Sequence, residues 1–227
     1  MRVRRRLRVR PLRLAGRPVP RQNRVTPFGD IVRTAARGLL FGNRGVLHDE
    51  REELIRSWQV RRWIACRLRF KDWHREPMPP GRYTGLFFLD EATALAAGHR
   101  PCAECRREDF LRFRDAWAAA RGAAGGVVRA DDVDRVLHAE RLAPGGVKRA
   151  HRAQAGALVD GAMVEVDGGA WLVLGEEILS WSPFGYGERR ARPHGWLQLL
   201  TPPSTVAAVG AGYGTPMLHP SAASTTS

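Results

Sequence analysis

Hydrophobic and polar positions follow a helical period in the middle of the chain. The segment "LFFLDEATALAAG" predicts a strand at residues 86–89 and a short helix that Asp90 caps and Gly98 ends. The next segment, "REDFLRFRDAWAAARG", spaces its aromatic residues as one face of a helix up to Gly122. We therefore expect a strand and two helices in this region.

The pattern changes to short alternating runs in the second half. A helix is expected to open at Asp131 in "DDVDRVLHAERL". Four runs then predict strands with turns between them: "AMVEV", "AWLVL", "EILSW" and "WLQLL". A final helix is expected with Thr201 as its N-cap and Pro202 at its first position.

These elements predict an α+β fold, in which a small α+β module precedes a β-rich domain shaped as a small barrel or rolled sheet. The glycine-rich break "GAAGG" at residues 122–126 is the best candidate boundary. The predicted divisions are a basic disordered tail, an α+β module, a helix with a basic linker, the β-rich domain and a disordered C-terminal tail: 1–24, 25–122, 123–157, 158–219 and 220–227.

Charge is concentrated at the start of the chain. The formal net charge is +14, but residues 1–24 hold ten of the 37 basic residues and no acid, so that 27 basic residues face 23 acidic ones afterwards. Such an arginine-rich segment attracts any polyanion without reading its sequence, although an early start codon or a compositional bias would also explain it. No run of about 18 apolar residues and no export signal is present, which favours a cytoplasmic protein without a membrane span.

The three cysteines are the strongest chemical signal. Cys102 and Cys105 form a C-x-x-C, a spacing that brings two thiolates to one side of a tetrahedral zinc ion. A thioredoxin-like redox pair is the competing interpretation, but that motif opens a helix directly after a strand, whereas here a helix precedes it. A zinc site needs four ligands, so two more must come from elsewhere in the chain.

The segment "FFLDEATALAAGHRPCAECRR" resembles the Ada-type metal-binding domain, a module of bacterial methyl-phosphotriester repair regulators. "WIACRLRF" upstream adds Cys66 followed by Arg67, as in that family's C-R-x-x-C motif. The resemblance covers roughly residues 60–110. It implies a zinc site formed by Cys66, Cys102 and Cys105, and a nucleic-acid partner.

One family position is different here. Phe70 stands where the family has its second upstream cysteine, so another group must supply the fourth ligand. His74 is the preferred candidate, with His99, His48 and water as alternatives. A neutral fourth ligand leaves the site less negative than four thiolates would, which predicts that Cys66, the residue at the family's methyl-accepting position, is a poor nucleophile.

Two further groups of residues have chemistry that suits nucleic acid. Asn43, His48 and Asp49, or the segment "KRAHRAQ" with Lys148 and His151, could each form half of a metal-dependent nuclease site, although neither has a diagnostic spacing. The segment "LSWSPFGYGERRARPHGW" mixes aromatic and basic residues, as stacking platforms for bases do and as an ordinary core with a solvated turn does. The arginines expected to contact nucleic acid are Arg67, Arg100, Arg106, Arg149, Arg152, Arg189 and Arg190.

The sequence favours a zinc protein that binds DNA or RNA through an Ada-like module, and the resemblance implies a role in DNA repair or processing. The alternative is an enzyme, either an alkyl-group acceptor at Cys66 or a metal-dependent nuclease. A structural zinc protein with a protein partner is the third interpretation. Substrate and oligomeric state do not follow from the sequence.

Overall fold

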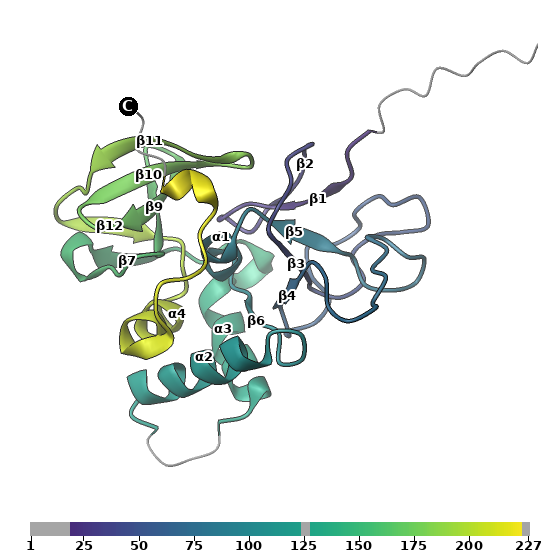
Figure 1. Ribbon diagram of the computed structural model, residues 1–227, viewed down its shortest axis with the longest axis horizontal. Coiled ribbons are helices and arrows are strands. Elements are labelled where there is room, and N and C mark those ends of the chain that lie inside the picture. Colours follow the sequence, from purple (N-terminus) through teal and green to yellow (C-terminus); the bar gives the residue numbers. More distant parts are fainter. Residues whose placement is uncertain (1–18, 124–127, 224–227) are drawn as a thin grey trace, which may run out of the picture.

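The computed structural model describes residues 19–123 and 128–223 and has the expected α+β fold, with two six-stranded sheets (Figure 1). The first sheet has the order β2-β1-β5-β3-β4-β6, with parallel pairing in β1–β5 and β4–β6 and antiparallel pairing elsewhere. Its strands are β1 (Gln22–Val25), β2 (Ile31–Arg33), β3 (Leu40–Asn43), β4 (Ile64–Arg67), β5 (Leu86–Phe88) and β6 (Arg100–Pro101).

The second sheet is antiparallel throughout and has the order β11-β10-β9-β8-β12-β7. Asp167 and Gly168, with φ of 52° and 75°, form the tight turn between β8 and β9 that the "DGG" segment predicts. Its strands are β7 (His151–Gln154), β8 (Met163–Val166), β9 (Gly169–Leu174), β10 (Glu177–Ser182), β11 (Gly185–Ala191) and β12 (Trp196–Leu199).

In the part of the chain that the structure describes, four α-helices connect and cover the sheets: α1 (Glu91–Ala96), α2 (Arg107–Ala120), α3 (Ala130–Arg141) and α4 (Pro203–Ala208). A π-helical turn, Val209–Tyr213, continues α4, and three 3₁₀ turns lie at Pro144–Gly146, Ala155–Ala157 and Pro220–Ala222. Helix α1 lies between the two sheets, while α2, α3 and α4 gather at one end of the molecule (Figure 1). Among the described residues, no helix is both long and apolar enough to cross a membrane.

Helix α1 begins and ends where the sequence predicts. The Asp90 carboxylate accepts hydrogen bonds from the backbone N–H of Thr93 at 2.9 Å and from its hydroxyl at 2.8 Å. Gly98 ends the helix with a φ of +89°, and a β-carbon there would lie 2.6 Å from Cδ of Arg141. Glycine at this position therefore allows both the left-handed backbone and the close passage of the Arg141 side chain.

The hydrophobic clusters continue across the glycine-rich segment at 122–126. Phe113 and Trp117 of α2 share one cluster with Val133 and Leu137 of α3, on the other side of that segment. A second cluster joins the α1 region to the second sheet through Leu89, Ala92, Ala96, Met163, Leu172 and Leu179. Burial of apolar surface therefore joins the two halves of the chain.

Several expected boundaries differ from the observed ones. Residues 22–24 belong to β1 rather than to a tail, while 1–18 of the predicted tail lie outside the described residues. The C-terminal prediction is wrong for Pro220–Ala222, a 3₁₀ turn whose Ala222 is buried, and residues 224–227 are likewise outside the description. Strand β7 forms in the segment expected to be a basic linker, and β11 forms in the aromatic and basic segment.

Helix starts also shift by one or two residues. The N-cap of α3 is Arg129 rather than Asp131, and that of α4 is Pro202 rather than Thr201. The Thr201 hydroxyl instead accepts a hydrogen bond from the backbone N–H of Met163 at 2.9 Å, which ties the start of α4 to β8. A threonine that pairs with a neighbouring strand is not available to cap its own helix.

Replacing Asp90 should destabilise the whole fold. Besides capping α1, its carboxylate accepts hydrogen bonds from the Tyr186 hydroxyl at 2.7 Å and from the backbone N–H of His219 at 3.0 Å. Asp90→Ala would leave these buried donors unpaired, and we expect the free energy of unfolding to fall by about 3 kcal/mol. Denaturant titration measures this loss. Asp115→Ala, at an exposed site, is the control and should change stability by less than about 0.5 kcal/mol; equal midpoints for the two variants would contradict the expectation.

Candidate metal centre

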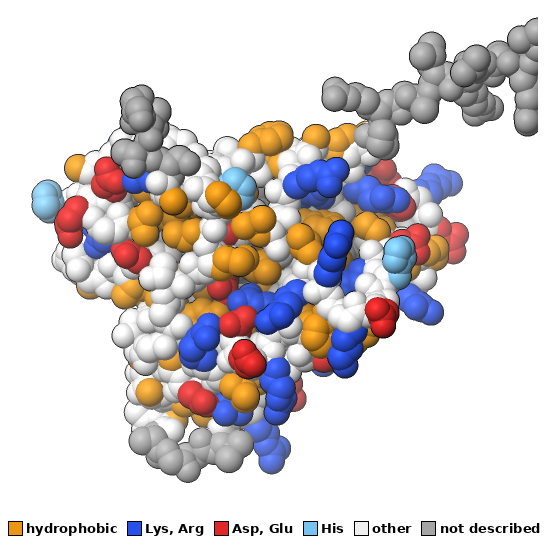
Figure 2. All heavy atoms as spheres, in the orientation of Figure 1, with side chains coloured by type: hydrophobic (Ala, Val, Ile, Leu, Met, Phe, Trp, Pro, Cys, Tyr) orange, Lys and Arg blue, Asp and Glu red, His pale blue; other side chains and the backbone are white. Residues whose placement is uncertain are grey.

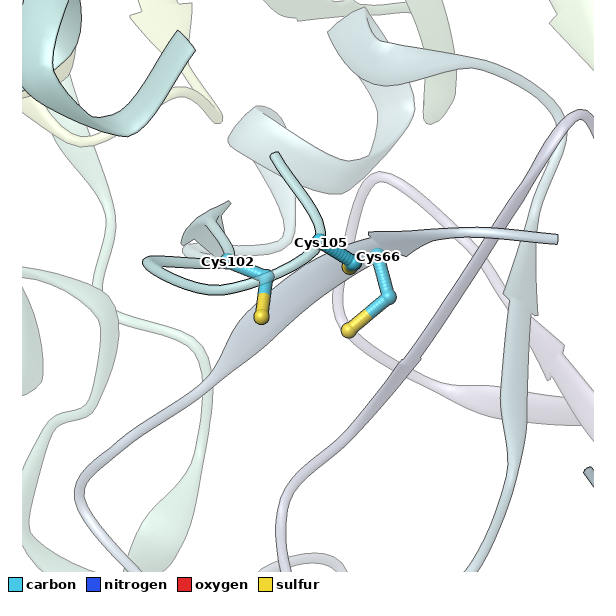
Figure 3. Close-up of side chains that lie close together, drawn as sticks. All are labelled: Cys66, Cys102 and Cys105. Carbon is cyan, nitrogen blue, oxygen red and sulfur yellow. The ribbon is translucent and has the colours of Figure 1, made fainter. Parts of the chain in front are cut away.

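The three cysteines come together at one edge of the first sheet. Cys66 lies in β4, opposite Phe41 of β3, while Cys102 and Cys105 lie in the loop between β6 and α2. The Cys102 N–H donates to the carbonyl of Ala65 at 2.9 Å, so backbone pairing continues from β6 to the first cysteine of the loop. In Figure 3 the sulfurs of Cys66 and Cys102 point the same way, one from the strand and one from the loop.

The sulfurs form a compact group that could hold a metal ion. The three Sγ atoms lie within 4.8 Å of one another, all three residues are buried, and the cysteines are unbridged thiols. Three thiolates about 2.3 Å from a tetrahedral ion lie roughly 4 Å apart, so this spacing suits a shared metal. The prediction that Cys66 joins the C-x-x-C is confirmed.

A buried ion pair fixes the loop that carries Cys105. The next residue, Arg106, donates from Nη2 to Glu91 at 2.6 Å and from Nε to Asp109 at 2.9 Å. The Arg106 N–H also donates to the Cys102 carbonyl at 3.1 Å, which closes the turn between the two cysteines. Both ends of the C-x-x-C are therefore held before any metal binds.

The thiols influence each other strongly. Hydrogen bonding with Cys102 and Cys105, together with burial, raises the pKa of Cys66 far above its usual range. Hydrogen bonds from Cys105 and Cys66, and from the backbone N–H groups of Glu104 and Cys105, lower the pKa of Cys102. Three adjacent thiolates repel one another, and a cation is the partner that would let all three ionise together.

A pocket of about 450 Å³ opens beside Cys66 and Cys102. Its walls include the aromatic side chains of Phe41, Trp73 and Tyr83, and the guanidinium group of Arg75. Burial lowers the pKa of Arg75, but hydrogen bonding to the Cys66 sulfur and attraction by Cys105 outweigh that effect and raise it overall. Sequence reasoning missed Arg75, although its position next to His74 was a signal that could have found it.

The structure narrows the choice of a fourth ligand. His74 is exposed and lines this pocket, but it lies outside the group of sulfurs that are within 4.8 Å of one another. His99 is buried in the core, where Arg44 donates to its Nε2 at 3.3 Å, and His48 is bonded to the Thr84 hydroxyl at 2.6 Å. Neither alternative histidine faces the sulfurs, whereas Glu104, which the sequence did not suggest, lines the pocket.

Two of the seven arginines expected to contact nucleic acid are buried in ion pairs. Arg100 forms a two-pronged pair with Asp134 at 2.9 and 2.7 Å, and Arg106 pairs with Glu91. We therefore correct both predictions, because guanidinium groups already paired inside the protein do not reach a phosphate.

The other five arginines reach the surface to different degrees. Arg67, Arg149 and Arg152 are exposed, whereas Arg189 and Arg190 are each paired with a carboxylate of the second sheet, Glu177 and Glu188. The aromatic and basic segment is likewise divided. Tyr186 is buried and donates to Asp90, and Trp181 donates to the Thr93 hydroxyl, while Phe184 and Trp196 are exposed.

The possible nuclease groups do not assemble. The Asp49 carboxylate accepts from the N–H groups of Arg51 and Glu53 in its own turn, and His151 is bonded to the carbonyl of Glu140. Within residues 19–123 and 128–223, the cysteine group is the sole cluster of three or more potential metal ligands.

Comparison of the chain with protein-family models, with curated proteins and with solved structures found no match. The interpretation of the site therefore depends on its own geometry.

The metal content of single variants should show that the cysteines, and not His74, are needed to hold the metal. We expect Cys66→Ser, Cys102→Ser and Cys105→Ser each to lose tightly bound metal, because three sulfurs supply most of the coordination. His74→Ala should keep the metal, since this exposed side chain lies outside the sulfur group. Elemental analysis of dialysed protein measures the metal content of each variant. Metal-free wild-type protein, or a Cys105→Ser variant that holds as much metal as the wild type, would contradict this expectation.

Proposed function

We propose that this protein binds one zinc ion through Cys66, Cys102 and Cys105, and that the surface beside this site binds DNA or RNA. The observation that supports it most strongly is the buried group of three sulfurs next to a pocket with aromatic walls and a cationic side chain, Arg75. Thiolate ligands favour zinc over harder ions. Aromatic rings and guanidinium groups are the side chains on which unpaired bases stack and phosphates bind.

Unpaired cations near the pocket support a polyanionic partner. Four basic side chains adjoin pocket residues or Phe70 in the chain, are exposed, and form no ion pair within the described part of the chain: Arg67, Arg69, Lys71 and Arg82. On the face shown in Figure 2, Lys and Arg side chains gather over the part of the molecule with the first sheet and the helices, and few lie over the second sheet. Exposed cations without partners are free to replace the counterions of a nucleic acid.

The position of Phe70 supports the Ada-like interpretation of the site. Its ring packs against the cluster that contains the three cysteines. A cysteine at this position would therefore approach the other sulfurs, as the family's fourth cysteine does. With phenylalanine here, the fourth ligand is expected to be His74, which lines the pocket although it lies outside the sulfur group, or water, and the three sulfurs supply most of the coordination in either case.

Alkyl transfer to Cys66 is a second candidate, because Cys66 lines the pocket and is thus next to bound ligand. In such a step the sulfur would form a bond to the methyl carbon of a phosphotriester while the carbon–oxygen bond breaks, leaving a phosphodiester anion. Three thiolates with a neutral fourth ligand have one negative charge less than four thiolates. Cys66 is therefore expected to be a weak acceptor.

Nucleic-acid binding should depend on salt through the exposed arginines near the pocket. Arg67→Gln/Arg69→Gln should reduce the slope of log affinity against log salt by about 2, because each lost phosphate contact removes about 0.9. Fluorescence anisotropy of labelled single-stranded and duplex oligonucleotides at several KCl concentrations measures the slope. Arg189→Gln/Arg190→Gln, whose cations are already paired with acids, is the control and should leave it nearly unchanged. Equal slopes in both variants would place the contacts elsewhere.

Phe70→Cys should increase the reactivity of Cys66 towards methylated phosphate by about tenfold or more, because a fourth thiolate restores negative charge at the metal. Mass spectrometry of protein incubated with DNA containing methyl phosphotriesters follows the methyl group. Leu68→Cys adds a thiol at an exposed position of the same segment and serves as the control. Stoichiometric methylation of the wild type within minutes would contradict the expectation and favour the alkyl-acceptor function.

A further inference from the structure

A second pocket, of about 420 Å³, is lined by cations that the proposed zinc site does not use. Arg44, Arg141 and Lys148 line it, and they come from the loop after β3, the end of α3 and the segment before β7. Arg44 is 1% exposed, Arg141 is fully buried and Lys148 is partly buried, while a fourth cation of the wall, Arg56, is exposed. Phe28, Trp63 and Val147 form apolar parts of the wall.

The indole ring of Trp63 holds the two guanidinium groups together. Cζ of Arg44 lies 4.0 Å from the ring centroid and Cζ of Arg141 lies 3.9 Å from it. Cation–π contacts of this kind orient the cations and offset part of the cost of burying them. They add no negative charge.

The hydrogen bonds of these cations go to neutral acceptors. Arg44 donates to the carbonyl of Gly29 at 2.8 Å and to Nε2 of His99 at 3.3 Å, and Arg141 donates to the carbonyl of Gly98 at 2.8 Å. Lys148 donates to the carbonyl of Ala96. Within the described residues, no carboxylate lies within 4.0 Å of any of the three, and Nη2 of Arg44 and Nε of Arg141 have no hydrogen-bond partner.

Such an arrangement is costly without a counterion. Buried charges in proteins are normally paired, because removing each from water costs several kcal/mol. Burial, and then the positive charges of Arg44 and Arg141, lower the pKa of Lys148 to about 7. Burial is also the main cause that lowers the pKa of Arg44 and of Arg141 to about 9. The one acidic residue in the wall, Asp30, is exposed and balances a single positive charge.

We propose that this pocket binds the phosphate group of a small phosphate monoester. Arg56 also lines the pocket, so four cations and one carboxylate leave a charge of +3 when all are ionised, which is enough to hold a phosphate dianion and exceeds what a single carboxylate would need. Lys148, which is partly buried, and Arg56, which is exposed, are the donors for its oxygens, while Arg44 and Arg141, whose unpartnered Nη2 and Nε atoms are buried, add positive charge behind them. The pocket is larger than phosphate alone requires, and its apolar wall suits the organic part of the ester.

The pocket is separate from the metal centre although the two share a pair of strands. Asn43 and Ile64 are opposite each other in the β3–β4 pairing and line the cysteine pocket. The adjacent residues Arg44 and Trp63 line the cationic pocket. Successive residues of a strand point to opposite faces, so the two pockets lie on opposite sides of this strand pair.

The test uses the full chain with inorganic phosphate and adenosine monophosphate as probes. Isothermal titration calorimetry and thermal unfolding are compared at constant ionic strength, adjusted with KCl, so that general charge screening is the same throughout. We expect adenosine monophosphate to bind more tightly than inorganic phosphate and to raise the melting temperature. Binding no stronger than the chloride control would overturn the proposal, and equal affinity for the two probes would overturn the role given to the apolar wall.

Lys148→Met is the decisive variant, because it keeps the length of the side chain and removes the charge. Affinity for adenosine monophosphate should fall at least tenfold, while the ligand-free variant should melt no lower than the wild type, since a partly buried charge without an acidic partner has been removed. A purely structural lysine would instead lower the melting temperature and leave affinity unchanged, which would overturn the proposal. Arg149→Met changes the exposed neighbour and should keep wild-type affinity. Arg44→Met provides a second loss-of-charge variant if it folds.

Competition identifies the source of the phosphate. An oligonucleotide with a 5′-phosphate that displaces adenosine monophosphate, while its unphosphorylated form does not, would identify the end of a nucleic acid as the source. Failure of both to compete would identify a free small molecule. Lys148→Met should retain the metal content of the wild type, and Cys105→Ser should retain phosphate binding. The phosphate proposal and the metal proposal can therefore be contradicted independently of each other.

Discussion

The arrangement of the cysteine loop and the C-terminal segment around α1 depends on the hydrogen bonds that the Glu91 carboxylate accepts. This residue lies at the first position of α1 and accepts from Arg106 at 2.6 Å, from the Tyr213 hydroxyl at 2.5 Å and from the backbone N–H of Met217 at 3.0 Å. Arg106 fixes the loop that carries Cys105, while Tyr213 and Met217 belong to the C-terminal segment. One buried charge therefore joins the cysteine group to the C-terminal segment, and removing one partner of such a pair typically costs about 3–5 kcal/mol.

The parts of the fold that depend on local sequence were predictable. Helix α1, its cap at Asp90 and its end at Gly98 follow from residues a few positions apart, and so does the C-x-x-C. Cys66 was found through a family resemblance rather than through spacing. Strands β7 and β11 escaped prediction because they consist mostly of polar residues, whose side chains give no clear hydrophobic alternation.

Long-range pairing explains the remaining differences. Arg100 and Arg106 look like surface cations next to a zinc motif, but Asp134 is 34 positions from Arg100, and Glu91 is 15 positions from Arg106. The cationic pocket is still less visible in the sequence. Arg44 and Arg56 are far along the chain from Arg141 and Lys148, and Lys148 stands in a segment that composition alone identifies as a basic linker. A pattern of residue types does not show which charged side chains form ion pairs in the folded protein.

The strand pair β3–β4 couples the two pockets, because residues at its end line both of them. Asn43 and Ile64 face one side, and Arg44 and Trp63 face the other, because the side chains of a strand alternate with a period of two. An insertion or deletion of one residue that shifts the register at the end of β3 would turn the guanidinium group towards the sulfurs and the amide towards the cations. Both pockets would be lost in a single step. A substitution can therefore change either pocket separately, whereas a shift in the register of this strand would change both.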